Sequence, residues 1–362
     1  MVALLSGFDY LCEIYFRNSM KLSRIFIFAA VLAVLAAGCK KPESTTREFL
    51  DGDLTLSVPA YVAPGSVMEF DVESLMTASR GDGGPLGYYF NNPFTEKSDT
   101  VVDPQGNILV PVYTVTVSDT LGPVTLLFGA AASDKYYGTT AEAEMTVVKE
   151  GFDGNGSITG FVNHDDDLLY TDIREDIPVD YRYVRCGDTY WMRTNLAWGG
   201  AGVAYEDCDV MDGLFGRYYS WEEAQTACPP GWRLPSEEDW LELAREYGSG
   251  GEPELGSDFK GLAGALMADL YFNGTRMWEY WPDVKVTDAS RLSVMPAGYA
   301  VMSVDGFSFG NVYSYAAFWT SEEAGDKGVL RYIYEEKDIV YRFEADKKGL
   351  AASVRCVRDA EE

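Results

Sequence analysis

Apolar and polar residues alternate from Leu54 to Val148, and this alternation limits the fold of that stretch more than any other feature. Successive side chains of a β-strand point to opposite faces, so a period of two indicates a strand with one buried face. Clusters of Gly, Pro and Asp separate the runs and predict turns. No apolar repeat of helical period occurs there, so we expect residues 51–150 to be all-β. The alternating or apolar runs are 54–58, 67–72, 112–117, 124–131 and 141–148.

These runs and their turns leave room for about seven short strands, the number found in an immunoglobulin-like sandwich. The stretch contains no cysteine, so it resembles the Ig-like modules of bacterial proteins more closely than antibody domains. Such modules usually act as spacers. The resemblance therefore implies an Ig-like β-sandwich over residues 51–150 that holds a second domain away from its attachment point.

A signal peptide is predicted over residues 20–38. A basic segment from Met20 to Arg24 precedes an apolar run from Ile25 to Ala37, which is the pattern of a secretory signal. The apolar run is too short to span ~30 Å of hydrocarbon as a permanent helix. We interpret residues 1–19 as an extension produced by a misassigned start codon, so Cys12 does not belong to the mature protein.

The signal ends in Leu35-Ala36-Ala37-Gly38-Cys39, which resembles the bacterial lipobox. Ala36 stands where that motif usually has Leu. The resemblance implies that the thiol of Cys39 receives lipid, that the chain is cut before it, and that acyl chains hold the protein on a membrane. The alternative is a secreted protein in which Cys39 is incidental. Residues 40–48 are polar, and residues 39–50 form the expected lipidated tether.

Lys40 and Lys41 follow the lipidated cysteine. An Asp at that place resembles the inner-membrane retention signal of some Gram-negative bacteria, and its absence favours the outer membrane. The sequence leaves open whether the protein faces the periplasm or the cell surface.

The chain has 57 acidic and 29 basic residues and a formal net charge of −28. Such a charge repels phosphate backbones, so we expect no nucleic-acid partner. Oxygen side chains recur between Asp153 and Gly160 in the Gly- and Asp-rich linker of residues 151–180, a spacing that could hold Ca²⁺. The full calcium loop with its terminal Glu is missing, and a plain turn is the alternative. We therefore predict no cofactor and no metal site, with Ca²⁺ as the open exception.

Four cysteines remain once Cys12 and Cys39 are set aside, and an even number in an oxidising compartment predicts two disulfides with three possible connectivities. They are Cys186, Cys208, Cys228 and Cys356.

The last half of the chain resembles the Fibrobacter succinogenes major paralogous domain, a family found in lipoproteins of gut Gram-negative bacteria. The most specific segment is Cys228–Ser236, which reads Cys-Pro-Pro-Gly-Trp-Arg-Leu-Pro-Ser. Met295–Tyr299 reads Met-Pro-Ala-Gly-Tyr where the family usually has Leu-Pro-Gly-Gly-Tyr. Other matching segments are Gly187–Leu196, Gly216–Ala224, Phe318–Glu322 and Val354–Asp359.

Two helices are predicted within this region. Ser220 with Glu223, and Ser236 with Asp239, have the spacing of N-terminal capping pairs. The first helix is expected over 221–227, because two prolines follow Cys228. The second is expected over 237–247, with Gly248 at its end. Strands are expected over 292–301, 328–335, 338–343 and 352–357.

Two helices followed by strands resemble the C-type-lectin-like fold, so the resemblance implies an α+β domain over residues 181–360. In that fold a cysteine after the first helix commonly joins one in the last strand. The resemblance therefore implies a disulfide between Cys228 and Cys356, which leaves Cys186 to pair with Cys208.

Domains of this fold present ligands to long loops after the second helix. The loop 267–290 holds four aromatic residues that could stack on sugar rings or anchor a protein partner, or could instead pack a small core under the loop. They are Tyr271, Trp278, Tyr280 and Trp281. The triplets typical of calcium-dependent lectins are absent, so sugar binding would not follow that calcium mode.

An enzyme is the less favoured alternative. Formylglycine-generating enzymes have a related fold and use reactive cysteines, but here lipid and disulfides account for the cysteines. His164 is the only histidine, which excludes a histidine zinc cage. We therefore expect a non-catalytic outer-membrane lipoprotein that binds an extracellular glycan or protein, with a structural or fimbria-associated subunit as the alternative.

Overall fold

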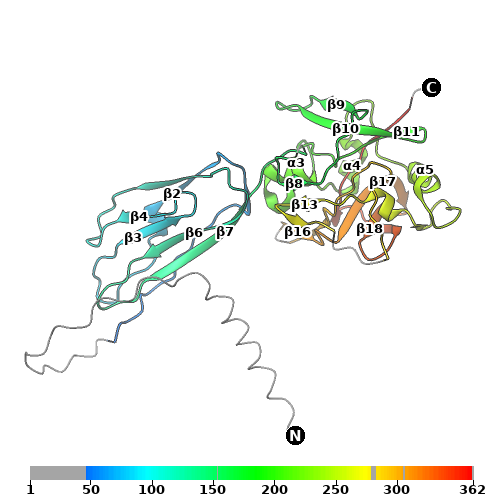
Figure 1. The fold of residues 1–362 in the computed structure, drawn as a ribbon. Helices are drawn as coiled ribbons and strands as arrows, with labels where there is room; N and C mark the ends of the chain where they lie inside the picture. Colours follow the sequence, from blue (N-terminus) through cyan, green and yellow to red (C-terminus); the bar gives the residue numbers. More distant parts are fainter. Residues whose placement is uncertain (1–45, 153, 279–282, 305, 361–362) are drawn as a thin grey trace, which may run out of the picture. The chain divides into compact units, whose positions relative to one another are not determined.

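The computed structural model describes residues 46–152, 154–278, 283–304 and 306–360 (Figure 1). Cys12, Cys39, Tyr280 and Trp281 lie outside the described residues. Residues 47–362 group into one compact unit, in which the chain is mostly β and arranged in several sheets. Among the described residues, no helix has the length and apolar character needed to cross a membrane.

Two sheets face each other in the region from Tyr61 to Val147. In the larger sheet β1 pairs in parallel with β7 and the other pairs are antiparallel; its order is β1 (Tyr61–Val62), β7 (Thr139–Val147), β6 (Gly122–Ala130), β3 (Tyr88–Asn92) and β4 (Lys97–Val102). The smaller sheet is the antiparallel pair β2 (Val67–Asp71) and β5 (Val112–Thr116). A short helix, α2 (Val72–Leu75), follows β2.

Aromatic rings fill the space between these two sheets. The Phe90 ring of β3 stacks on the Tyr113 ring of β5 at 4.2 Å, and its centroid lies 5.6 Å from that of Phe70 in β2. Phe90 and Phe128 are fully buried. Burying rings of this size is the main source of stability for such a pair of sheets.

Four of the five predicted runs in this region form strands β2, β5, β6 and β7. The run 54–58 is different: it lies outside any strand, although Leu54 is buried against the same core. The alternation of apolar and polar residues therefore predicted correctly which side chains of this run are buried. The run nevertheless pairs with no strand. Strands β3 and β4 were not among the named runs, because polar residues such as Asn91, Asn92 and Lys97 interrupt their apolar pattern.

The region from Ile158 to Asp359 contains four further sheets and the longer helices. One sheet orders β21 (Val357–Asp359), β11 (Thr189–Met192), β10 (Val179–Cys186) and β9 (Leu168–Asp172). A second orders β12 (Phe259–Lys260), β19 (Ile339–Asp346), β18 (Lys327–Tyr334) and β17 (Tyr315–Ala324). The two small sheets are β14 (Thr275–Arg276), β13 (Tyr271–Phe272) and β8 (Ile158–Thr159), and β16 (Gly306–Gly310), β15 (Tyr299–Ser303) and β20 (Leu350–Ala351).

Both predicted helices of this region are confirmed at their predicted bounds, α4 (Trp221–Ala227) and α5 (Glu237–Tyr247). Each begins with a complete capping box, formed by Ser220 with Glu223 and by Ser236 with Asp239. Caps of this kind stabilise a helix by about 1 kcal/mol. The remaining helices are short: η1 (Tyr205–Asp207), η2 (Asp209–Met211), α3 (Asp212–Phe215) and α6 (Ala263–Leu266).

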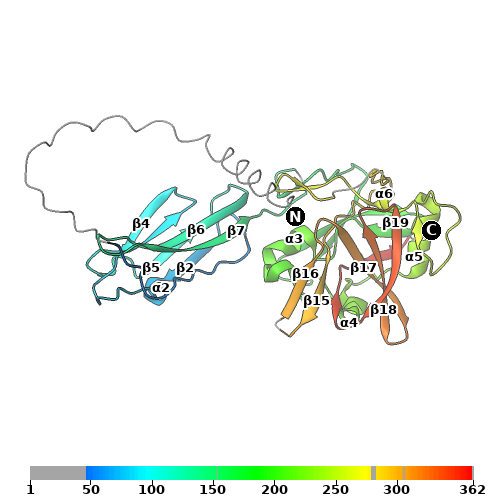
Figure 2. The ribbon, with the colours of Figure 1, turned by 90° about the horizontal axis from the view of Figure 1, so that it is seen from below.

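Helix α5 packs on one face of the β17–β18–β19 sheet, and Figures 1 and 2 show the helix beside these strands. Trp240 of α5 lies 5.8 Å from Phe318 of β17, measured between ring centroids, and both are buried. Ile333 of β18 and Val340 of β19 belong to the same core. This face of the sheet is therefore closed. On the opposite face Trp319 and Ala345 are buried in a second core, and the tyrosine side chains around Tyr332 stay half-buried.

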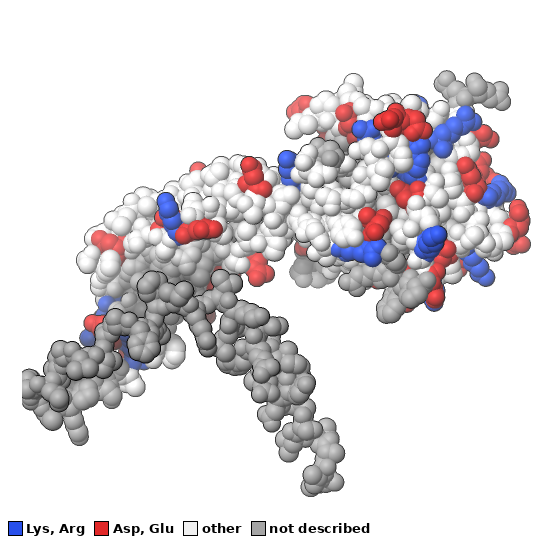
Figure 3. Space-filling view, viewed as in Figure 1, with Lys and Arg blue, Asp and Glu red and all other residues white. Residues whose placement is uncertain are grey.

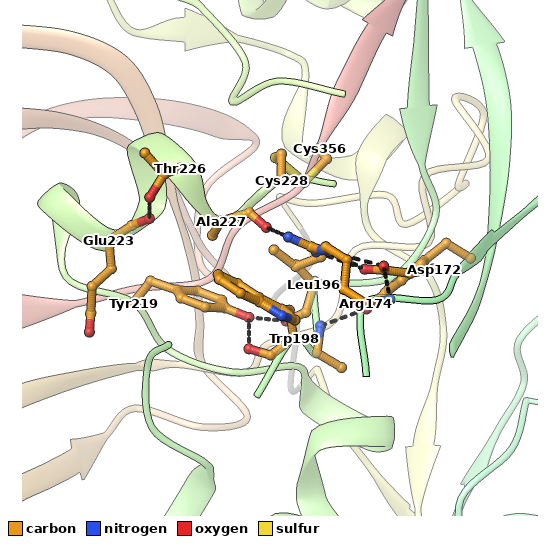
Figure 4. Close-up of a disulfide and its surroundings, with 12 residues drawn as sticks. Asp172, Arg174, Leu196, Trp198, Tyr219, Glu223, Thr226, Ala227, Cys228 and Cys356 are labelled. Carbon is orange, nitrogen blue, oxygen red and sulfur yellow. Dashed lines mark hydrogen bonds and ion pairs between the residues drawn. A yellow bond between two sulfur atoms is a disulfide. The ribbon is translucent and has the colours of Figure 1, made fainter. Parts of the chain in front are cut away.

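A disulfide joins Cys228, directly after α4, to Cys356, directly before β21, with Cα atoms 5.8 Å apart. This is the pair that the family resemblance implies. Near it, Arg174 donates a hydrogen bond of 2.7 Å to the carbonyl of Ala227 and its guanidinium lies 4.3 Å from the Trp198 ring (Figure 4). Closing a loop of this length stabilises the fold by about 4–5 kcal/mol in the chain-entropy model.

The predicted second disulfide, between Cys186 and Cys208, is wrong. Both cysteines are free and buried. Cys186 ends β10 and belongs to the core beneath α5, whereas Cys208 lies between η1 and η2 and belongs to a different hydrophobic cluster. A disulfide requires Cα atoms within about 7 Å of each other. An even number of cysteines does not show which of them lie that close in the folded chain. Burial also raises the pKa of Cys186 to about 12, which disfavours its reactive thiolate.

This arrangement predicts two hidden thiols. In the chain from Lys40 on, purified without reductant, we expect no reaction with a thiol reagent in the native state and two reactive thiols after denaturation. Mass spectrometry of the alkylated denatured protein should place both labels on Cys186 and Cys208. An unlabelled denatured protein would show that these two cysteines are paired after all.

Candidate functional site

One of the four aromatic residues of the predicted ligand loop, Trp278, is not exposed to solvent. Trp278 is fully buried, and its indole N–H donates a hydrogen bond of 3.1 Å to the carbonyl of Val294. The prediction is therefore wrong for Trp278, which packs in the core beneath α5. Tyr271 is half-buried in the small strand β13, and Tyr280 and Trp281 lie outside the described residues.

A different aromatic surface lies on the face of the β17–β18–β19 sheet that α5 leaves open. Alternation along β18 points Ile333 into the core and Tyr332 and Tyr334 to the other side. Cross-strand pairing places Tyr315 of β17 opposite Tyr334, and Tyr341 of β19 opposite Tyr332. Directly opposed side chains on one face of a sheet are near enough for their rings to touch.

These four side chains form a continuous stack, here named the tyrosine ladder: Tyr334, Tyr315, Tyr332 and Tyr341. The successive ring centroids are 4.7, 5.9 and 4.9 Å apart, with interplanar angles of 25°, 20° and 15°. Each ring is half-buried. The ring faces are therefore used mostly against one another, and the ladder presents ring edges and hydroxyl groups outward.

An open cavity of about 390 Å³, here named the ladder cavity, lies beside the ladder. Buried Ala317 and Leu330 form its floor, where the small Ala317 side chain leaves room between larger neighbours. The walls come from the ladder on one side and from β15 and β20 on the other. The lining residues are Tyr299, Val301, Tyr315, Ala317, Leu330, Tyr332, Phe343 and Leu350.

The rim of the cavity is partly polar and partly apolar. The hydroxyl of Tyr299 accepts a hydrogen bond of 2.9 Å from the Asn311 side-chain amide, which fixes its position. Phe343 is 52% exposed and meets Tyr332 edge to face at 6.5 Å, while Val301 is 42% exposed. Large apolar side chains with this exposure at the mouth of a cavity are typical of binding surfaces.

Two acidic groups act on the ladder tyrosines. A hydrogen bond to the Glu336 carboxylate raises the pKa of Tyr334 to about 12. Burial, together with the negative charge of Asp258, raises the pKa of Tyr332 and of Tyr341. The phenols therefore stay protonated at neutral pH, and their hydroxyl groups are available as hydrogen-bond donors and acceptors.

The two arginines of the same sheet are already paired. Arg331 points to the closed face, where it forms a buried ion pair with Glu237 of α5, and Arg342 pairs with Glu344 at 2.8 Å. Figure 3 shows blue side chains beside red ones over the C-terminal part of the chain. Among the described residues, no group of three or more His, Cys, Asp or Glu side chains is placed to hold a metal ion. What the ladder and its cavity offer chemically is contact with an apolar group and hydrogen bonding at the rim.

The sequence carries a signal for this surface in the spacing of its aromatic residues. Aromatic residues occur two apart at Tyr332 and Tyr334, and again at Tyr341 and Phe343. Two aromatic residues at this spacing on neighbouring strands share one face of the sheet. The position of the covering helix decides whether the aromatic face is core or surface. Sequence alone does not show which face of the sheet that helix covers.

The comparison with known families agrees with the motifs. The family model described as the Fibrobacter succinogenes major domain matches residues 184–358, from β10 to β21, and this range includes the whole ladder and the disulfide. No curated protein and no solved structure matches the chain.

Substitution of the buried Trp278 and of the half-exposed Phe343 should destabilise the protein to very different extents. Trp278→Ala should lower the free energy of unfolding by about 3–5 kcal/mol, because it removes a fully buried ring. Phe343→Ser should change it by less than about 1 kcal/mol, because that ring is half exposed. Urea unfolding followed by circular dichroism measures both. Equal destabilisation by the two substitutions would contradict the assignment of Trp278 to the core and Phe343 to the surface.

Proposed function

We propose that the region matched by the Fibrobacter succinogenes major domain model, residues 184–358, is the binding part of a lipid-anchored outer-membrane protein with a non-catalytic binding or adhesion role. The ligand is an extracellular glycan or protein. The binding surface is the tyrosine ladder with its cavity.

The observation that carries this proposal is the combination of an open apolar cavity with half-exposed aromatic side chains on a rigid sheet. Ligand sites are usually concave and mostly apolar, with a few polar groups that orient the ligand. Tyrosine is enriched at such surfaces because its ring gives a large contact area and its hydroxyl group stays hydrated or bonded. The hydroxyls of Tyr299 and of the ladder supply those polar groups here.

The finer fold assignments support the same role. We propose that the two facing sheets formed by strands β1–β7 are an Ig-like spacer, because they enclose one aromatic core and contain no cysteine. We propose a C-type-lectin-like fold for the family domain, because β21 pairs with β11 near its start and a disulfide joins α4 to the segment before β21. A spacer and a rigid tip together suit binding at a distance from a membrane.

The membrane attachment is proposed from the sequence. The lipobox-like segment ending at Cys39 supports lipidation there, and the lysines that follow support the outer membrane rather than the inner one. Acyl chains would hold the protein on the membrane without a spanning helix.

A binding panel tests the proposed function. We expect the chain from Lys40 on, which contains the compact unit 47–362, to bind a component of a panel of glycans, mucins and extracellular proteins. The double variant Val301→Ser/Phe343→Ser should weaken that binding at least about tenfold, because it removes apolar contacts at the mouth of the cavity.

The matched control is Leu168→Ser/Leu169→Ser on β9. Leu168 and Leu169 are 43% and 55% exposed, close to the 42% and 52% of Val301 and Phe343, but they do not line the cavity. Binding should be unchanged in this control. Binding that survives the cavity substitutions, or that is lost equally in both variants, would rule out the ladder cavity as the site.

A further inference from the structure

We propose that the ladder cavity binds a segment of a partner protein that carries one large apolar or aromatic side chain flanked by Lys or Arg. This inference rests on the proposed binding function and names the chemistry of its ligand. Three properties of the surface lead to it: the lining of the cavity, the stacking of the ladder, and the charge around both.

The lining suits an apolar side chain better than a sugar ring. The floor is made by Ala317 and Leu330, whose side chains offer no hydrogen-bonding atom, and the wall opposite the ladder includes Val301 and Leu350. A pyranose placed there would bury hydroxyl groups without partners, which costs free energy. A Leu or Phe side chain loses nothing of this kind, and a cavity of about 390 Å³ has room for one such group.

The ladder itself also disfavours stacking with a sugar. Sugar rings stack on open aromatic faces, but Tyr315 and Tyr332 each lie between two neighbours of the ladder and use both faces for those contacts. What they leave outward is edges and hydroxyl groups. An apolar anchor can pack against ring edges, and the backbone of a peptide can bond to the hydroxyls.

The charge around the ladder selects basic flanks. Glu336 lies at the Tyr334 end, and Asp258 acts on Tyr332 and Tyr341. The guanidinium groups of Arg331 and Arg342 do not offset them, because both are engaged in ion pairs with Glu237 or Glu344. The chain as a whole has a net charge of −28. Lys or Arg beside the anchor would therefore be attracted on approach and could lie over the ring edges and carboxylates of the rim.

Selection from a random dodecapeptide library displayed on phage tests this inference. The immobilised chain from Lys40 on should enrich peptides in which a large aliphatic or aromatic residue has Lys or Arg within a few positions. Synthetic copies of these peptides should bind the Val301→Ser/Phe343→Ser variant at least about tenfold more weakly. They should bind the Leu168→Ser/Leu169→Ser control as they bind the unsubstituted chain.

Two further measurements examine the charge. Glu336→Gln should reduce the enrichment of Lys and Arg while leaving that of the apolar anchor, and raising the salt from 50 to 500 mM should weaken binding several-fold. Enriched peptides that are acidic, or that bind the cavity variant as well as the unsubstituted chain, would overturn the inference.

Other occupants give recognisably different results. If a neutral glycan binds and is lost on the cavity substitutions, the ladder cavity is a binding site but the inferred ligand class is wrong. Self-association of the chain in sedimentation, abolished by the same substitutions, also overturns the inferred partner. Failure of every probe to bind would count against the proposed function as well.

Discussion

The closed face of the β17–β18–β19 sheet determines what the rest of the domain can do. Helix α5 packs Trp240 and its neighbours on that face, and this contact fixes which residues of each strand are core. Because side chains alternate strictly, a shift of one residue in register would exchange the buried set for the tyrosine ladder. The ladder therefore exists at the surface because α5 occupies the opposite side.

A buried ion pair also holds α5 in place on the closed face of the sheet. Arg331 of β18 reaches through the closed face to Glu237 in the first turn of α5, with its guanidinium 4.0 Å from the Phe259 ring. Such a pair adds little net stability, since both charges lose their hydration, but it is costly to break and so distinguishes one register from others. It also removes a positive charge from the neighbourhood of the ladder, where Glu336 and Asp258 then dominate.

Local features of this chain could be predicted from sequence, and long-range ones could not. The capping serines and the prolines after Cys228 defined α4 and α5 to the residue, because these signals act within a turn of the helix. The Cys228–Cys356 pair came from family resemblance. The free state of Cys186 and Cys208 and the burial of Trp278 depend on which distant segments meet, and neither composition nor period contains that information. The ladder was visible as aromatic residues two apart, but only the position of α5 shows that they face outward.

The disulfide also decides how the domain carries tension. The ladder lies inside the loop that Cys228 and Cys356 close, so a pull applied at Tyr332 can reach Cys228 by two covalent routes. The shorter route runs forward to Cys356 and across the sulfur bridge, and the longer one runs back through α5. Under load the shorter route becomes taut first, which leaves the longer arm, with α5 and the buried Trp278, slack. A pull between the ladder and Cys228 would therefore be carried past the helix that supports the ladder, without drawing that helix out.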